Sequence, residues 1–274
     1  MQNIDFNLSY GTKPEKVSLC GLLTPFNMFF VKDILKKRKV LFVVNDEQTA
    51  LKYQKDFKTL FDVNSFVLPA QEISFYSELD KNYYIYQEQI NIFLNQPNLV
   101  IAPIKALSER FNSLEFYKKN LINLKKDDTI DYSKIAQKLV DYGYKRVAQI
   151  SDIGEFALRG DILDIYSLAD SPVRIEFFAD VIEDIRKFNP NTQKSYLHVD
   201  EINILPLYKF ILDDKNKEKF KTKINSIKCG EFQKKIKDEL LERFENLGYF
   251  DGIEYYQNFF LDKTSSVLDF FKDY

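Results

Sequence analysis

The sequence is poor in the residues that build metal sites and nucleophilic active sites: its 274 residues include two cysteines and one histidine. Cys20 and Cys229 lie far apart, and the absence of any Cys-X-X-Cys or Cys/His spacing argues against a structural zinc site. So few cysteines fit a reducing, cytoplasmic setting. The only histidine, His198, falls in the loop-like stretch Asn189–Asp200, where an exposed loop side chain is the simpler interpretation. A Ser-His-Asp or Cys-His mechanism would depend on this residue alone, so we expect neither such catalysis, nor a metal, nor a cofactor.

Long apolar runs and a strong charge imbalance are also missing. No run approaches the roughly 18 apolar residues of a membrane span, and the N-terminus lacks the pattern of a signal peptide. The formal net charge is −2, so nothing requires the basic face with which proteins bind DNA phosphates. With 45% hydrophobic and 29% charged residues, the composition is that of a folded protein with a real core. These features speak against a membrane role and against a module that binds DNA by itself.

The first part of the chain alternates strand and helix patterns. Val40–Val44 is a continuous apolar run, typical of a strand buried on both faces, and Asn45 or Asp46 can cap the helix that follows it. Repeated strand–helix units predict a parallel sheet wrapped by helices. The expected strands are Val17–Leu19, Val40–Val44, Phe66–Leu68 and Leu99–Ala102, and the expected helices are Phe26–Lys37, Glu47–Phe61, Lys81–Leu94 and Ile104–Phe111.

The pattern then changes to that of a β-rich module. After a helix at Ser133–Tyr142, the segment Val147–Phe188 alternates strands with turns, and Ile202–Leu205 is a further strand. Helical spacing then resumes, with lysines interleaved with Glu and Asp, which favours a solvated surface over a nucleic-acid face. We expect an α/β domain at 1–126, an inserted mostly-β module at 127–208 and a helical return segment at 209–274.

One strand of this module carries an unusual face. In Val173–Phe178 the apolar side chains alternate with Arg174, Glu176 and Phe178, which must point to the opposite side, and Ala179-Asp180 can close a tight hairpin. An exposed Phe beside an Arg is typical of a protein-binding patch, because Arg and aromatic residues are enriched in interface hot spots. A solvated face with one stray Phe, or a Phe covered by a neighbouring helix, fits the pattern equally well.

The α/β pattern raises the question of a phosphate-binding loop after Val17–Leu19, where GxxxxGK[ST] is expected. The segment Cys20–Asn27 contains Gly21 and Thr24, but no lysine and no Ser or Thr beside a lysine. Without the lysine there is no point charge for the β- and γ-phosphates of a nucleotide. We therefore expect that this site does not use ATP in the usual way.

Two long motifs carry a family resemblance. Gly154–Ile165 reads GEFALRGDILDI and is similar to the motif GEFxxRGDILDI. Val173–Asp180 reads VRIEFFAD and, with the residues that follow, is similar to RIEFF(G/A)DxIExIR. These motifs resemble the N-terminal, UvrB-like region of the bacterial transcription-repair coupling factors, the Mfd family. Weaker similarity at Leu99–Phe111, Ile204–Pro206 and Asp251–Tyr256 extends the resemblance over nearly the whole chain.

The resemblance implies the fold class: α/β, with a degenerate P-loop-type parallel sheet at 1–126, a UvrB domain 2-like module at 127–208 and a domain 1b-like return segment at 209–274. UvrB keeps a working P-loop, whereas this family has lost it, so the missing lysine near Gly21 places the chain with the coupling factors. The family's polymerase-binding domain and ATP-driven translocase lie downstream, so we expect the chain to be the leading part of a longer protein.

The resemblance also implies a non-catalytic adaptor that recruits UvrA to RNA polymerase stalled at DNA damage. In this family UvrA docks on the β-rich module, while downstream domains bind RNA polymerase and double-stranded DNA. The residues that match the family's UvrA contacts are Arg159, Arg174 and Phe178.

Supporting roles are expected for neighbours of these residues. Gly160 is interpreted as a glycine within a strand, whose bulge or close approach re-aims Arg159. Asp161 and Glu176 are either partner contacts themselves or carboxylates that orient the arginines, and we favour the second interpretation. Acid–base catalysis by Asp161 and Asp164 is not expected, because they belong to a strand motif without an accompanying pocket.

Two alternatives stay open. A UvrB-like, ATP-dependent helicase component would need a phosphate site in Cys20–Asn27, and micromolar binding of ATP in equilibrium dialysis would favour it. An autonomous DNA-binding module would give a salt-dependent gel shift on damaged duplex.

Overall fold

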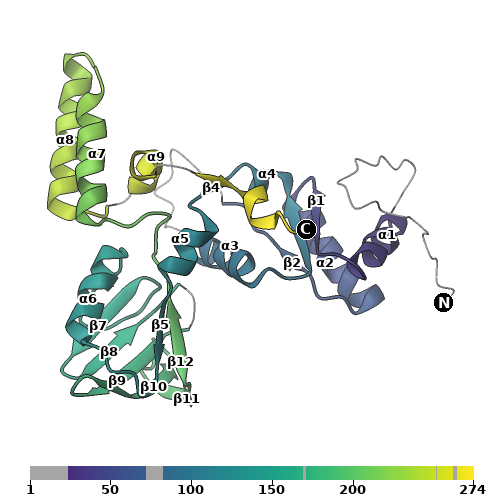
Figure 1. Ribbon diagram of the computed structural model, residues 1–274, viewed down its shortest axis with the longest axis horizontal. Helices are drawn as coiled ribbons and strands as arrows, with labels where there is room; N and C mark the ends of the chain where they lie inside the picture. The colour runs from purple at the N-terminus through teal and green to yellow at the C-terminus, as the bar shows by residue number, and fades with distance from the viewer. Residues whose placement is uncertain (1–23, 72–82, 169–170, 251, 262–263) are drawn as a thin grey trace. The chain divides into compact units, whose positions relative to one another are not determined.

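The computed structural model describes residues 24–71, 83–168, 171–250, 252–261 and 264–274, and the chain forms two compact units (Figure 1). Unit 1 comprises Met1–Arg110 and Ser266–Tyr274, and unit 2 comprises Phe111–Ser265. The short strands β4 (Arg110–Phe111) and β13 (Ser265–Ser266) lie where the chain passes from one unit to the other. The expected strand Val17–Leu19 lies outside the described residues. The division at 126 and 208 stays a prediction.

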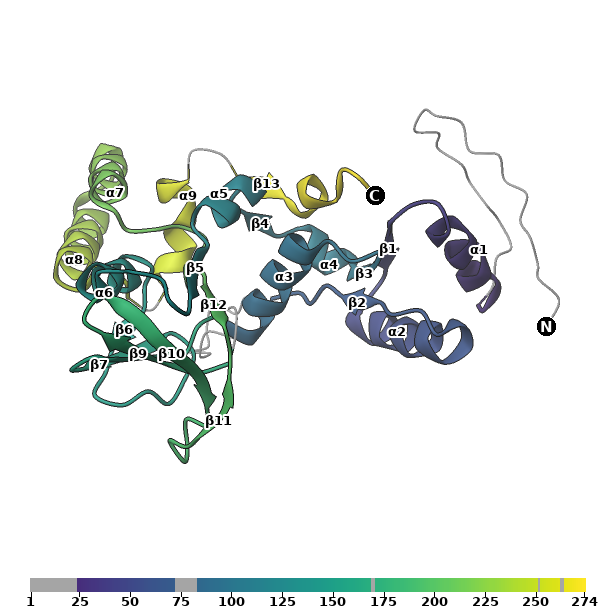
Figure 2. The same cartoon turned by 60° about the horizontal axis from the view of Figure 1, so that its bottom comes forward.

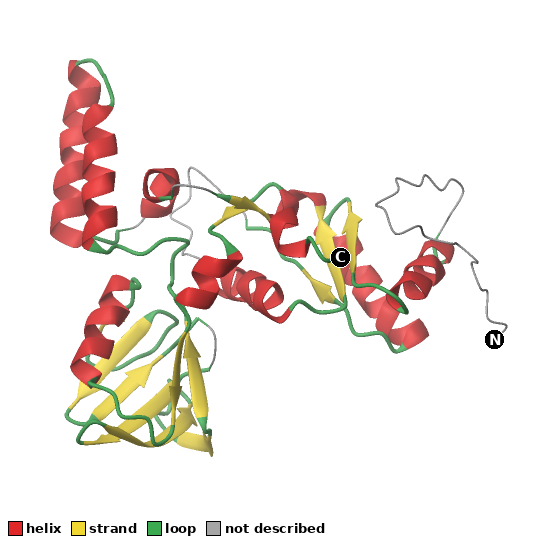
Figure 3. Cartoon of the chain, in the orientation of Figure 1, coloured by secondary structure: helices red, strands yellow, loops and turns green. Residues whose placement is uncertain are grey.

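Unit 1 contains a parallel sheet, which confirms the expected α/β class (Figure 3). Its strand order is β1 (Val40–Val44), β3 (Leu99–Pro103), β2 (Phe66–Val67), and the central strand β3 is buried along its whole length. The helices of this unit are α1 (Phe26–Leu35), α2 (Glu47–Phe61), α3 (Tyr83–Asn95), α4 (Ile104–Leu107) and the 3-10 helix η2 (Val267–Phe271).

Strand β1 and the residues after it show what the sequence pattern predicted correctly and what it did not. Val43 is 43% exposed, so β1 is not buried on both faces. Among the described strands β1 has a neighbour on one side only, and an apolar composition does not reveal an edge position. The cap after β1 is confirmed: the Asp46 carboxylate accepts a hydrogen bond from the Thr49 backbone N–H at 2.7 Å.

The helix expected at Ile104–Phe111 is wrong in its second half. It ends at Leu107 as α4, and the Ser108 hydroxyl donates to the Lys105 carbonyl at 2.7 Å. Serine competes in this way with the backbone bonds that would continue a helix. The next residue, Glu109, accepts hydrogen bonds from the Gln71 backbone N–H and the Gln89 side chain. Tertiary partners therefore hold this segment out of the helix.

Unit 2 is built on a six-stranded sheet with the order β11-β10-β9-β8-β7-β6. Figure 2 shows its paired strands β9 and β10 side by side. All neighbouring strands are antiparallel except β6 and β7, which are parallel. A separate antiparallel pair joins β5 (Ile122–Lys125) to β12 (Glu201–Ile204), and the helices α5 (Leu114–Lys119) and α6 (Tyr132–Asp141) belong to this part of the chain. The six strands are β6 (Lys145–Arg146), β7 (Glu155–Arg159), β8 (Ile162–Ile165), β9 (Val173–Phe178), β10 (Val181–Phe188) and β11 (Ser195–His198).

The helical segment of unit 2 is joined to the β-module by stacked aromatic rings. Tyr208, just after β12, stacks on Tyr249 with ring centroids 4.4 Å apart, and Phe210 stacks on Phe260 at 4.2 Å. Phe260 in turn stacks on Phe220 at 4.8 Å. Such contacts bury large apolar area in a defined geometry, so this part of the helical segment is anchored to the β-module. Its elements are α7 (Asp214–Ser226), α8 (Glu231–Leu247), the 3-10 helix η1 (Ile253–Tyr256) and α9 (Gln257–Phe260).

Candidate protein-docking face

The alternation predicted for Val173–Phe178 is confirmed, and it divides the sheet into two faces. Val173, Ile175 and Phe177 are buried, whereas Arg174 and Glu176 are partly exposed and Phe178 is 75% exposed. A Phe under a neighbouring helix is thereby excluded. We call the side of β7–β11 that carries Arg174, Glu176 and Phe178 the polar face.

The strand register places charged residues from several strands in two cross-strand rows on the polar face. In the first row, Arg174 of β9 lies opposite Asp164 of β8 on one side and Arg186 of β10 on the other. In the second row, Glu176 lies opposite Asp184 of β10, on the side away from β8. Directly opposed residues have Cβ atoms about 5 Å apart, so the charges within each row are in reach of one another. The complete rows are Ala157, Asp164, Arg174, Arg186, His198 and Arg159, Ile162, Glu176, Asp184.

Asp164 joins the two arginines that the sequence singled out. Its Oδ1 accepts from Arg174 Nε at 2.7 Å and its Oδ2 from Arg174 Nη2 at 2.9 Å, a two-bond fork. Oδ2 also accepts a hydrogen bond from Arg159 Nη2. The Asp164 side chain has 0% exposure, against 18% for Arg174 and 45% for Arg159. Hydrogen bonding to Asp164 raises the pKa of Arg174, which is therefore a fixed positive charge.

Arg174 is further held by an apolar surface on the same face. Its guanidinium carbon lies 4.8 Å from the ring centroid of Phe188, within cation–π range. Phe188 forms a small buried cluster with Ile150 and Ala157. Gln193 Oε1 accepts a long hydrogen bond of 3.4 Å from Arg174 Nη2. Among the described residues, Nη1 of Arg174 has no hydrogen-bond partner, so that nitrogen is what Arg174 can offer to another molecule.

A second ion-pair cluster occupies the other side of the polar face. Arg186 pairs with Glu176 and, at 3.2 Å, with Asp184. Oδ1 of Asp184 also lies 3.0 Å from Nδ1 of His198, within hydrogen-bonding distance. The exposed histidine expected here is found, but the expected loop is not: His198 ends strand β11. Its strand pairing depends on β10, which local sequence does not reveal.

The turn that follows Arg159 differs from the interpretation made from the sequence. Gly160 does not lie within a strand; Gly160 and Asp161 are the two-residue turn between β7 and β8, where Arg159 pairs with Ile162. The φ of Gly160 is +58°, a conformation that glycine adopts without cost. The Asp161 side chain is exposed, and its backbone carbonyl accepts from the Phe177 N–H at 2.8 Å.

The hairpin expected at Ala179-Asp180 is confirmed, and it presents Phe178. Phe178 pairs with Val181 across this turn, in which Ala179 has a φ of +53°. The Ile130 N–H donates to the Asp180 carbonyl at 2.6 Å, and Thr129 forms an isolated antiparallel β-bridge with Val181. The exposed Phe178 ring therefore stands on a turn that is tied by backbone bonds to a separate segment of unit 2.

Asp164, Arg186 and Asp184 are the polar-face residues that sequence reasoning missed. The signal for Asp164 was present, since a charged residue between buried Leu163 and Ile165 must point to the opposite side of its strand. Its pairing with Arg174 was hidden, because the sequence of β8 and of β9 does not by itself fix the register of one strand against the other.

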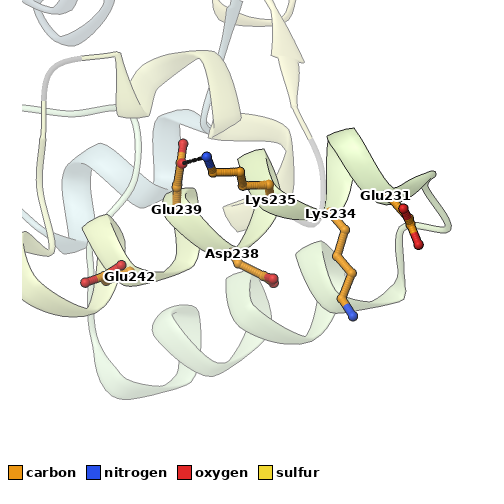
Figure 4. A pocket seen from close by; sticks show the side chains of 6 residues that line it. All are labelled: Glu231, Lys234, Lys235, Asp238, Glu239 and Glu242. Atoms are coloured by element: carbon orange, nitrogen blue, oxygen red, sulfur yellow. Dashed lines mark ion pairs between the residues drawn. The ribbon is translucent and has the colours of Figure 1, made fainter.

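Other candidate sites are less organised. The charged face of α8 is formed by six side chains of that one helix, and Lys235 and Glu239 form an ion pair at 4.0 Å (Figure 4). This face is solvated, as its mixed charges predicted. Of the would-be nucleotide loop, Gly21 lies outside the described residues, and the exposed Thr24 hydroxyl lies 3.1 Å from the Tyr53 hydroxyl. Within the described ranges, His, Cys, Asp and Glu form no cluster suited to a metal ion, and no helix could span a bilayer.

Comparison with known proteins first defines the class of the β-rich part. Residues 122–210 match the family described as the UvrB interaction domain, and this stretch contains the whole six-stranded sheet. The β-rich part of unit 2 is thus similar to a domain whose name refers to interaction.

Nearly the whole chain is similar to transcription-repair-coupling factors. A transcription-repair-coupling factor of Staphylococcus aureus (strain bovine RF122 / ET3-1) is 26% identical over 284 aligned positions, covering 98% of this chain and 24% of that protein. The transcription-repair-coupling factor of Borreliella burgdorferi is 32% identical over 236 positions, covering 81% of this chain and 20% of that protein. The chain therefore spans about a quarter or less of the length of these relatives. The resemblance to the N-terminal region of the transcription-repair coupling factors is confirmed.

Proposed function

We propose that this chain is a docking module of a transcription-repair coupling factor, and that it binds UvrA through the polar face of unit 2. The observation that carries the proposal is the arrangement of Arg159, Arg174 and Phe178 on one face of a hydrogen-bonded sheet. That face lies within the stretch that matches the UvrB interaction domain. A preorganised Arg and an exposed aromatic ring are the residue types that dominate interface energies.

The three residues contribute to binding in different ways. Phe178 is a free apolar anchor, and Arg159 is half exposed with two of its three guanidinium nitrogens unbonded among the described residues. Arg174 is mostly buried and offers Nη1. Arg174 therefore makes a limited direct contact with the partner, and Asp164 holds its guanidinium in place.

The proposal extends to the longer protein of which this chain is expected to be a part. The docked UvrA would be delivered to RNA polymerase stalled at DNA damage, with the polymerase and double-stranded DNA bound by downstream domains. Unit 1 would be a non-catalytic relative of a helicase domain with a degenerate P-loop. The absence of a lysine in Cys20–Asn27 supports this assignment.

The decisive experiment measures binding of purified UvrA to the 274-residue chain and its variants. Arg174→Ala, with the fold intact by circular dichroism, should lower the affinity by about 30-fold or more, which is roughly 2 kcal/mol. Arg159→Ala and Phe178→Ala should also weaken binding. Arg146→Ala is the matched control, because Arg146 is exposed on edge strand β6 and lies opposite the core residue Phe156. Undiminished binding by folded Arg174→Ala would reject the site assignment.

A further inference from the structure

Asp164 occupies a position that a docking residue cannot occupy. Its side chain has 0% exposure, so no partner protein can touch it. Yet its two oxygens bind the guanidinium groups of Arg159 on β7 and Arg174 on β9 at the same time. The carboxylate is thus a bridge across three adjacent strands, placed beneath the two arginines of the proposed docking site.

We propose that Asp164 is the positioning residue of the polar face, and that the site it forms accepts one carboxylate of the partner. This inference rests on the proposed docking function and deepens it. Arg159, Arg174 and Asp164 together carry one net positive charge. That charge matches a single acidic side chain of the partner better than a cluster of acidic side chains. The N–H donors left over, at Nη1 of Arg174 and at Nε and Nη1 of Arg159, come from adjacent guanidinium planes and suit the two oxygens of one carboxylate.

The physical reason is preorganisation. A free arginine side chain loses rotamer freedom when it is fixed by a partner, and that loss weakens binding. Arg174 has already lost it, because two bonds to Asp164, the Phe188 ring and Gln193 hold its guanidinium in place. Without the Asp164 charge, the two guanidinium groups would repel each other across β8 and turn toward water. The docking geometry would then exist for only a fraction of the time, and affinity would fall by that fraction.

The polar face offers a matched comparison for this role. Asp184 is also a carboxylate on the polar face, it also bridges two basic side chains, Arg186 and His198, and it is more exposed, at 22%. Among the described residues, the ion pairs of Asp184 go to Arg186 and His198, whereas those of Arg159 and Arg174 go to Asp164. Asp184→Asn therefore removes a similar carboxylate from the same face without releasing the proposed docking arginines.

A double-mutant cycle in UvrA affinity tests the proposal. We expect Asp164→Asn to weaken binding about tenfold to thirtyfold, and Asp184→Asn by less than about threefold. Arg159→Ala should cost much less in the Asp164→Asn background than alone, because the released arginine is no longer aligned. Phe178→Ala should lower the affinity by the same factor in both backgrounds, because the turn that carries Phe178 is bonded to Thr129 and Ile130 and not to Asp164. Arg159→Glu should bind more weakly than Arg159→Ala if the partner group is a carboxylate.

Asp164→Glu keeps the experiment decisive if Asp164→Asn does not fold. It retains the charge but moves it by one methylene, so it should remain folded and still bind UvrA more weakly than the native chain. Native-like affinity of Asp164→Asn or Asp164→Glu for UvrA would overturn the positioning role. The role would also be overturned if the effects of Arg159→Ala and of Phe178→Ala on affinity shrank equally in the Asp164→Asn background. If Arg159→Ala, Arg174→Ala and Phe178→Ala all bind normally, the docking assignment itself is what fails.

Discussion

The polar face of the sheet and the charged face of α8 carry similar residues and differ in how those residues are held. On α8, Lys and Glu or Asp side chains follow one another along a single exposed helix, and Lys235 and Glu239 approach to 4.0 Å (Figure 4). On the sheet, charges from different strands face one another in register, and one member, Asp164, is fully buried.

The difference explains why a composition of mixed charge means a solvated surface in one place and a candidate binding site in the other. An exposed ion pair one helical turn apart is little more stable than the same two charges hydrated separately, and each side chain keeps its rotamer freedom. A buried carboxylate between two guanidinium groups has lost its water, so its bonds must be made and their geometry is fixed. Only the second arrangement presents a defined shape to a partner.

The largest expected effect comes from removing the central carboxylate of the polar face. Asp164→Ala leaves the largely buried Arg174 without its counter-ion, and breaking such a buried pair should lower the free energy of unfolding by about 3–5 kcal/mol. Glu239→Ala on α8 should change it by less than about 0.5 kcal/mol. Urea denaturation followed by circular dichroism measures both. Similar values for the two variants would erase the distinction between the faces.

A smaller effect is expected in the second cluster of the polar face. Arg186→Ala leaves Glu176 and Asp184 directly opposite each other on adjacent strands, where like charges are destabilising. Because both carboxylates keep some contact with water, the loss should be about 1–2 kcal/mol, between those of the Asp164 and Glu239 variants. The same denaturation experiment applies, with Arg186→Lys as the variant that keeps the charge. A loss as large as that of Asp164→Ala would mean that burial does not set the order.

The smallest effect concerns a half-exposed carboxylate that is held in place by hydrogen bonds. Asp131 caps α6, and hydrogen bonds from the Ser133 hydroxyl and the first-turn backbone lower the pKa of Asp131 from its ordinary value of 3.8. Because the folded state favours the ionised form, its contribution to stability is complete above pH 3.8 and is lost as the pH falls below that value. Asp131→Asn keeps a good cap but removes the titration.

Stability measured between pH 6 and pH 3 should therefore fall slightly less in Asp131→Asn than in the native chain. The variant should match the native chain closely at neutral pH. A steeper acid loss in Asp131→Asn would show that the cap carboxylate is not stabilised by folding.

Local sequence was sufficient for much of the fold. The limits of β1, α2 and β9 agree with their patterns, because strand alternation and an Asp cap are set by residues a few positions apart. The errors arose where distant segments decide: the exposed edge of β1, the end of α4 at Ser108 and the strand that holds His198. In each case a neighbour from another part of the chain, or its absence, set the outcome.

For the candidate site, the sequence alone determined that Arg174 and Phe178 share one side of a strand, because side chains alternate along any extended backbone. Family motifs added Arg159, which no periodicity would have linked to them. Only the tertiary structure decided that Asp164 lies between the two arginines, since that depends on the register of β8 against β7 and β9. Register is a property of paired strands and not of any one of them, so the group that organises the face became visible only once the sheet was assembled.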